Sequence, residues 1–248
     1  MEFILMLIIG LFVGIFVISM GGGGGSIYLG VLTAFFSLAP ASAAATSIVT
    51  SLPALAIGCW LYYRQGKINF TLGNTMLIAA IPAVIVGALL APYIPTRIYS
   101  VIIGLILFIL GIQMLYNLRG SRKTKVPQNS KKLPLIFGAI SGLMVGVAGL
   151  SGGGPIMAGL LLLGASMLQA SATSSYVLIC MSLVGAVLHL AGGQVDWSAG
   201  ISLMLGAMVG AVIAPLLMKK FAVGKGALAL NIFMGFLLIL MGLKTMIG

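Results

Sequence analysis

The sequence predicts an all-α integral membrane protein made of two inverted repeats, each with five hydrophobic segments. Three observations support this: charge is scarce, charge-free stretches are long, and a series of motifs occurs twice in the same order. Of 248 residues, 61% are hydrophobic and 6% are charged, whereas a soluble domain carries about 25% charged residues. Because such a chain cannot cover a water-facing surface, we exclude a soluble enzyme and a nucleic-acid partner, despite the net charge of +11.

The charge-free stretches set the number of segments. Phe3–Tyr63 and Leu133–Val195 contain 61 and 63 residues without Asp, Glu, Lys or Arg, and a membrane helix needs roughly 20 apolar residues. Each long stretch therefore has room for three segments, and four shorter stretches hold one each. The predicted segments are Phe3–Met20, Ser26–Leu38, Ala41–Tyr63, Phe70–Ala91, Arg97–Asn117, Leu133–Leu150, Pro155–Gly164, Leu168–Ala191, Trp197–Met218 and Lys225–Ile247.

Residues 1–117 and 133–248 form the two predicted repeats, joined by a basic linker over 118–132. Ala45-Thr46-Ser47 matches Ala172-Thr173-Ser174, and Gly66-Lys67-Ile68-Asn69-Phe70 matches Gly193-Gln194-Val195-Asp196-Trp197 at the same offset of 127. Gly104 and Gly111 similarly match Gly235 and Gly242. The second segment of each repeat is short and follows a glycine run. Segments one and two therefore either span fully or form a Gly-rich re-entrant hairpin.

The basic residues predict opposite orientations for the two repeats. Placing the linker in the cytoplasm, as the positive-inside rule requires, leaves 11 of the 13 Lys and Arg residues inside. Only Arg97 and Lys244 then lie outside, together with Glu2, Asp196 and both termini. We therefore expect an integral membrane protein with a cytoplasmic basic linker, in contact with membrane lipid. An inverted repeat is typical of secondary transporters.

Two glycine runs are the first candidate site. They include Gly23, Gly24, Gly25 and Ser26 in the first repeat, and Ser151, Gly152, Gly153 and Gly154 in the second. Each run precedes a short helix, so it presents free backbone N–H groups and a positive dipole end. We expect these residues to bind a small anionic substrate near the bilayer midplane, although a glycine run is also typical of a tight turn or close packing.

Hydroxyl and titratable side chains supply two further candidates. Thr46, Ser47, Thr173 and Ser174 lie at matching positions and can donate hydrogen bonds to an anion, but they can equally hold helices together. His189 and Asp196 are a possible proton-linked pair, which has no titratable twin in the first repeat. For this pair we favour a structural role, with Asp196 as the N-cap of the following helix.

The remaining motifs are interpreted as structural. Gly10-x-x-x-Gly14, Gly142-x-x-x-Gly146 and Gly206-x-x-x-Gly210 predict helix-packing faces, and Trp60 and Trp197 predict interfacial anchors. Cys59 and Cys180 lie in apolar stretches with no metal-ligand spacing, which predicts small buried hydrophobes. The sequence indicates no metal and no cofactor, and it leaves a homodimer open.

In the order and duplication of these motifs, the sequence resembles the sulfite exporter TauE/SafE family. The resemblance rests on Gly149, Ser151-Gly152-Gly153-Gly154-Pro155, Ala172-Thr173-Ser174 and Gly193-Gln194-Val195-Asp196-Trp197, with their first-repeat partners, and it covers essentially the whole chain. It implies an inner-membrane permease for sulfite, sulfonates, sulfoacetate or other small organic anions. The first glycine run departs from the pattern, because Ser26 stands where the second repeat has Pro155.

The expected function is therefore a secondary transporter, in the exporting direction, that works by alternating access. The alternative is a channel whose glycine loops form an anion or cation filter. An enzyme is not expected, because one His and one outer Asp are too few groups for catalysis. Counterflow of labelled substrate in liposomes separates the first two, since carriers show it and open pores do not.

Overall fold

The structure is a computed structural model and describes residues 2–19, 25–34, 36–117, 132–149, 152–191 and 195–221, with positions 232, 235–236, 239–240, 242–244 and 246–247. Every regular element in this part of the chain is helical. The elements are α1 (Glu2–Ser19), α2 (Gly25–Ala34), α3 (Pro40–Arg64), α4 (Phe70–Leu90), the short 3-10 helix η1 (Ala91–Tyr93), α5 (Thr96–Asn117), α6 (Lys132–Ala148), α7 (Gly153–Leu162), α8 (Met167–Ala191) and α9 (Trp197–Phe221).

These helices agree closely with nine of the predicted segments, and the tenth, Lys225–Ile247, lies largely outside the described residues. The main difference is the second segment, which was predicted to reach Leu38 but ends at Ala34. Ser37 has a left-handed φ of 50°, and the Leu38 N–H turns back to the Leu32 carbonyl at 3.1 Å. This left-handed turn ends the helix before Pro40 begins the next one.

The outer surface of the described helices is apolar, as a lipid environment requires. Ile78 on α4 is 70% exposed and Val187 on α8 is 65% exposed. Within the described part of the chain, three helices are long and apolar enough to cross a membrane: Ala41–Arg64, Phe70–Tyr93 and Leu168–Leu190. The fold and its surface therefore define an all-helical integral membrane protein.

Two pairs of helices pack with very little space between their backbones, as the glycine motifs predicted. A Cβ added at Gly10 on α1 would meet the Leu203 carbonyl of α9, and one added at Gly206 would meet the Leu7 carbonyl. On the other side, Gly142 on α6 abuts the Ala80 carbonyl of α4. The packing role of these glycines is confirmed, and each contact joins a helix of residues 1–117 to one of residues 133–248.

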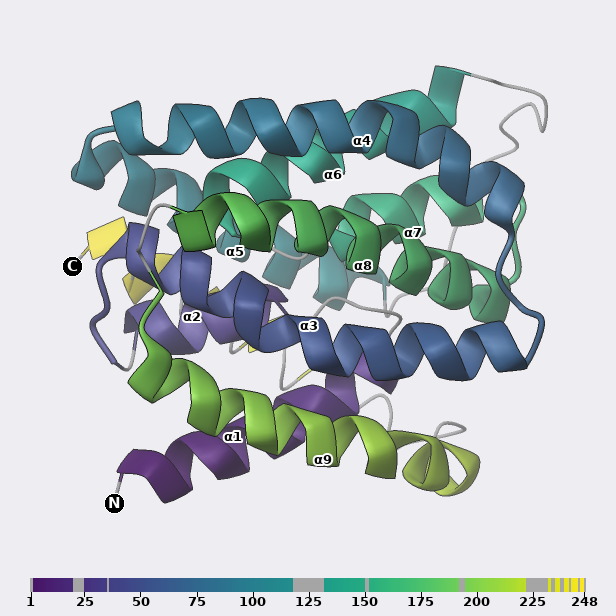
Figure 1. The fold of residues 1–248 in the computed structure, drawn as a ribbon, viewed down its shortest axis with the longest axis horizontal. Coiled ribbons are helices and arrows are strands. Elements are labelled where there is room, and N and C mark those ends of the chain that lie inside the picture. The colour runs from purple at the N-terminus through teal and green to yellow at the C-terminus, as the bar shows by residue number, and fades with distance from the viewer. Residues whose placement is uncertain are drawn as a thin grey trace.

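The directions of the helices follow from these contacts. Successive glycines Gly138, Gly142 and Gly146 of α6 face Met76, Ala80 and Val84 of α4, so the two helices run parallel. The same order holds for α1 and α9, where Gly10 and Gly14 face Leu203 and Ala207. Figure 1 shows that α4 runs opposite to α9, and α3 opposite to α8.

α5 packs closely against described residues near the C-terminus, and glycines lie at the contact points. A Cβ on Gly104 would meet the Gly242 carbonyl, and one on Gly111 would lie 2.7 Å from the Gly235 carbonyl. These four positions were matched between the repeats as Gly104 with Gly235 and Gly111 with Gly242. In the structure the pairing is crossed: Gly104 faces Gly242, the repeat partner of Gly111, and Gly111 faces Gly235, the repeat partner of Gly104.

Candidate functional site

The second glycine run turns the chain back into the protein between α6 and α7. Gly149 and Gly152 both have left-handed φ angles, of 65° and 59°, which glycine adopts without steric cost. A side chain would also lack room, because Gly149 lies against Ala44 of α3 and Gly152 lies against Ser141 of α6. Gly153 is the first residue of α7, and both Gly152 and Gly153 are buried. The free N–H groups at the start of this helix therefore lie in the protein interior.

Ser47 connects the hydroxyl set of the first half to this turn. Its Oγ hydrogen bonds to the Gly149 carbonyl and the Ala44 carbonyl, both at 2.8 Å. Ser47 is fully buried, so the bonds lie away from water and lipid. The first hydroxyl set is thus joined to Gly149, the residue that follows α6.

Thr46 and Thr173 make an equivalent pair of bonds to the helices that follow. The Asp196 N–H donates to the Thr46 Oγ1 at 2.9 Å, and the Asn69 N–H donates to the Thr173 Oγ1, also at 2.9 Å. Both threonines are fully buried. The starts of α9 and α4 lie toward opposite ends of the bundle (Figure 1), so the structure does not bring the two threonines together.

Two buried serines have side-chain oxygens without a hydrogen-bond partner. Ser174 was a predicted site residue, and Ser141 on α6 was not singled out; both are fully buried and neither Oγ is bonded. The Ser141 Cβ lies 3.2 Å from where a Cβ on Gly152 would stand, so its oxygen is next to the turn that begins α7. The available signal was a single polar residue within the apolar run Leu133–Leu150.

The first glycine run is described only at its end. Gly25 and Ser26 form the first turn of α2 and are buried, whereas Gly23 and Gly24 lie outside the described residues, as does Ser151 of the second run. Gly154 is in the first turn of α7 and is partly buried. Tyr28, one turn into α2, is fully buried and its hydroxyl has no hydrogen-bond partner.

Asp196 is the N-cap of α9, as the sequence predicted. Its Oδ1 accepts bonds from the Ala199 N–H at 3.1 Å, the Ser198 hydroxyl at 2.9 Å and the Ser198 N–H at 3.0 Å. These bonds, first that from Ala199, hold the pKa of the carboxyl below its usual value, while partial burial opposes them. Its repeat partner Asn69 caps α4 through a 3.1 Å bond from the Leu72 N–H. His189 lies in the last turn of α8 and is 5% exposed.

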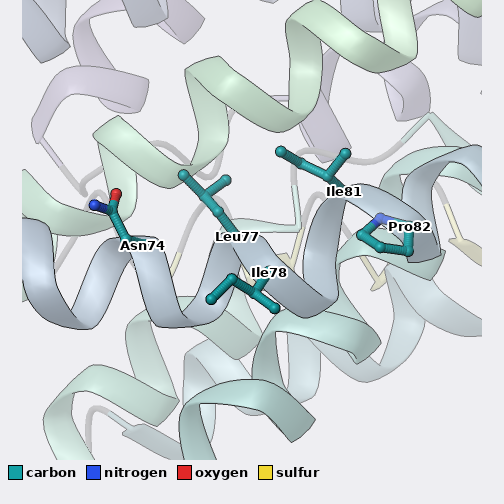
Figure 2. Close-up of a pocket in the computed structure, with 5 residues that line it drawn as sticks. All are labelled: Asn74, Leu77, Ile78, Ile81 and Pro82. Carbon is teal, nitrogen blue, oxygen red and sulfur yellow. The ribbon is translucent and has the colours of Figure 1, made fainter.

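Two open depressions on the described part of the surface contain none of the predicted site residues. Figure 2 shows one of about 390 Å³ on α4, lined by Asn74, Leu77, Ile78, Ile81 and Pro82. Its walls are apolar apart from Asn74, whose Oδ1 accepts a 2.8 Å bond from the Tyr176 hydroxyl. Since an anion leaving water needs hydrogen-bond donors, this lipid-facing depression is unsuited to one.

The environment of the cysteines differs from the prediction. Cys59 and Cys180 are free thiols, but each is only partly buried, so the interpretation as small buried hydrophobes is wrong. A cysteine side chain is small and apolar, so it can remain at such partly exposed positions. Across the described residues, no group of three or more His, Cys, Asp and Glu side chains gathers as a metal site would require.

Comparison with known proteins gives the family. The chain matches the family model described as "Sulfite exporter TauE/SafE" over residues 6–245. It therefore belongs to the sulfite exporter TauE/SafE family of membrane transporters, which confirms the resemblance seen in the sequence.

Two relatives of similar length accompany this match. The chain is 26% identical over 217 residues to "Probable membrane transporter protein YdhB" of Bacillus subtilis (strain 168), covering 84% of this chain and 87% of that protein. It is 28% identical over 204 residues to "Probable membrane transporter protein y4hK" of Sinorhizobium fredii (strain NBRC 101917 / NGR234), covering 77% and 78%. No solved structure matches the chain significantly.

Proposed function

We propose that the protein is a secondary transporter that exports small sulfur-containing or organic anions, such as sulfite, sulfonates or sulfoacetate. The observation that carries this proposal is the match to the sulfite exporter family over residues 6–245. The acidic residues of the whole chain are Glu2 and Asp196 alone, so the helices offer an anion little repulsion. Binding then rests on neutral donors.

The binding site that we propose lies at the start of α7. The first turn of an α-helix has N–H groups without a partner inside the helix, and Gly152–Gly153 presents them in the protein interior beside Ser141. A charge-assisted hydrogen bond contributes about 1.5–3 kcal/mol, so several such bonds offset much of the desolvation of the anion. With no fixed cation required, binding stays weak enough for release.

The transport cycle that we propose is alternating access between two inverted halves. Three observations support the inversion: corresponding helices run in opposite directions (Figure 1), the Thr46–Asp196 bond has its counterpart in Thr173–Asn69, and each half packs its first helix on the fourth helix of the other. In this scheme the two halves rock against each other about the shared α3 and α8. The loop holding Arg64 and Lys67 faces the cytoplasm, and Asp196 faces outward.

A channel would need the glycine runs to line a continuous pore. The Gly149 carbonyl, which would face such a pore, instead accepts a hydrogen bond from Ser47 at 2.8 Å. This bond supports a closed, packed turn and a carrier mechanism.

Counterflow tests the proposal. Purified protein in liposomes loaded with unlabelled sulfite is diluted into a trace of labelled sulfite, and the experiment is repeated with sulfoacetate, a simple alkylsulfonate and acetate. We expect transient accumulation of label for at least one of the sulfur anions. Uptake that merely equilibrates would instead indicate a pore, and label that stays outside with every anion would contradict transport of this substrate class.

A further inference from the structure

A second groove lies where α3, α4 and α8 meet, and aromatic side chains form much of its wall. It has a volume of about 360 Å³ and is lined by Ala56, Cys59, Trp60, Tyr63, Ile68, Phe70, Tyr176 and Ile179. The Phe70 ring packs edge-on against Tyr63 and Tyr176, with centroids 6.2 and 5.1 Å apart. This groove has the size of a small-molecule site and an apolar wall.

Two basic residues, Arg64 and Lys67, adjoin residues that line this groove, and neither has an acidic partner among the described residues. The Arg64 guanidinium lies over the Trp60 ring, 5.2 Å from its centroid, and Lys67 follows in the exposed turn to α4. The two acidic residues of the chain are Glu2 and Asp196. They stand in the sequence at the starts of α1 and α9, and these helix starts lie toward the end of the bundle opposite to the α3–α4 turn (Figure 1). The positive charge here must therefore be balanced from outside the chain.

The equivalent position of the other half lacks these features. At an offset of 127, Val187 replaces Trp60 and Leu190 replaces Tyr63. Ala191 and Gln194 stand where the first half has Arg64 and Lys67, and the acidic Asp196 replaces Asn69. The combination of an aromatic groove and paired cations is thus specific to one end of the molecule.

We propose that this groove binds one anionic phospholipid from the surrounding bilayer. An acyl chain lies in the groove against Trp60, Tyr63 and Phe70, and the phosphate sits between Arg64 and Lys67. Stacking on Trp60 covers one face of the guanidinium and leaves its N–H edge free for bidentate bonds to phosphate oxygens. An apolar wall with cations at one end matches a lipid, which has a long apolar tail and a charged head. A free anion would make no favourable contact with the apolar wall.

Native mass spectrometry of the detergent-purified full chain tests this proposal. Dioleoyl phosphatidylglycerol competes with the phosphatidylcholine of the same chains, and the ratio of bound lipids is measured. We expect wild type to prefer the anionic lipid. In the double variant Arg64→Gln with Lys67→Gln, this preference should fall at least about tenfold, because a basic residue near the membrane surface attracts anionic lipid by about 1 kcal/mol. Trp60→Ala with Phe70→Leu should weaken retention of both lipids.

Lys132→Gln is the matched control, since it removes an exposed charge from the start of α6, outside the groove. It should keep the lipid preference. Equal binding of the two lipids by wild type, an unchanged preference in the double variant, or an equal loss in Lys132→Gln would overturn the proposal. Displacement of phosphatidylglycerol by inorganic phosphate at equal concentration would show that the site holds an ion rather than a lipid. Gel filtration and circular dichroism confirm that each variant folds.

Discussion

The N–H of Asp196 donates a 2.9 Å hydrogen bond to the Oγ1 of Thr46, 150 residues earlier in the chain. The bond fastens the start of α9 to the first third of α3. The bond from Asn69 to Thr173 fastens α4 to α8 in the same way. The two threonines therefore hold each half of the protein to the other.

Removing either hydroxyl tests this structural role. Thr46→Val and Thr173→Val keep the shape of the side chain but leave a partly buried N–H without its acceptor. Each variant should lower the free energy of unfolding by about 1–3 kcal/mol, measured by denaturation in detergent. Thr75→Val is the control, because Thr75 is only partly buried and its hydroxyl bonds to the Thr71 carbonyl of its own helix. A loss of transport with unchanged stability would instead indicate contact with the substrate.

The second prediction concerns the cap of α9. Because its pKa is lowered in the folded protein, the Asp196 carboxylate contributes stability above the pKa of the unfolded chain. This contribution is lost as the pH falls through the lower folded value. The titration of Asp196 should therefore change the melting temperature little between about pH 6 and 8, and should lower it in acid.

Two substitutions separate the charge of Asp196 from its capping role. Asp196→Asn should keep most of the stability at neutral pH, because Asn69 caps α4 with the same geometry, and it should remove this residue's share of the acid sensitivity. Asp196→Ala should cost about 1 kcal/mol. If Asp196→Asn shifted a transport pH profile near neutrality, a proton-linked role would replace the capping role.

The third prediction compares two helix-interior glycines. A Cβ at Gly206 would collide with the Leu7 carbonyl of α1, whereas a Cβ at Gly185 would meet the flexible Ile48 and Val145 side chains at 3.4 Å. Gly206→Ala should therefore destabilise the protein by about 1–3 kcal/mol, and Gly185→Ala should be neutral or mildly stabilising. The melting temperatures of the two variants in detergent decide the matter. Equal effects would mean that α1 and α9 are not packed this closely.

Much of the fold could be predicted because helix boundaries in this chain carry local signals. Asp196 was predicted as the N-cap of α9, and the glycine pairs of α1, α6 and α9 marked packing faces. The end of α2 was not readable, since it depends on the left-handed turn at Ser37, a conformation that serine rarely adopts. The contacts between helices could not be predicted, because they join residues that are far apart in the sequence.

The candidate site was harder to predict than the fold. Thr46 and Thr173 were grouped by repeat position, but equivalent residues of opposed halves lie at opposite ends, so the repeat alone does not place them in one site. Ser141 was overlooked because its importance comes from the neighbouring turn at Gly152, eleven residues further on. Only the folded chain reveals that its oxygen is buried without a partner.

The fourth prediction concerns that oxygen. Ser141→Ala removes a donor next to the first turn of α7 and leaves no new unsatisfied group. Sulfite affinity in the counterflow assay should fall roughly ten- to a hundredfold, as expected for the loss of one hydrogen bond to a charged group, with stability nearly unchanged. Gly153→Leu should abolish binding by filling the approach to the helix start. Ser202→Ala, a buried serine of α9 that bonds to the Ser198 carbonyl, is the control. Parent-like affinity in both Ser141→Ala and Gly153→Leu would place the site elsewhere.

The opposed orientation of the two halves is the central claim, and cysteine labelling tests it most directly. In a background with Cys59→Ala and Cys180→Ala, single cysteines replace Gln65, in the exposed turn after α3, and Ser198, at the exposed start of α9. A membrane-impermeant maleimide is applied to intact cells and to inverted vesicles. The account predicts that the cysteine at 198 reacts only from outside and that the cysteine at 65 reacts only in inverted vesicles. Reaction of both from the same side would contradict the inverted repeat and the alternating-access cycle that depends on it.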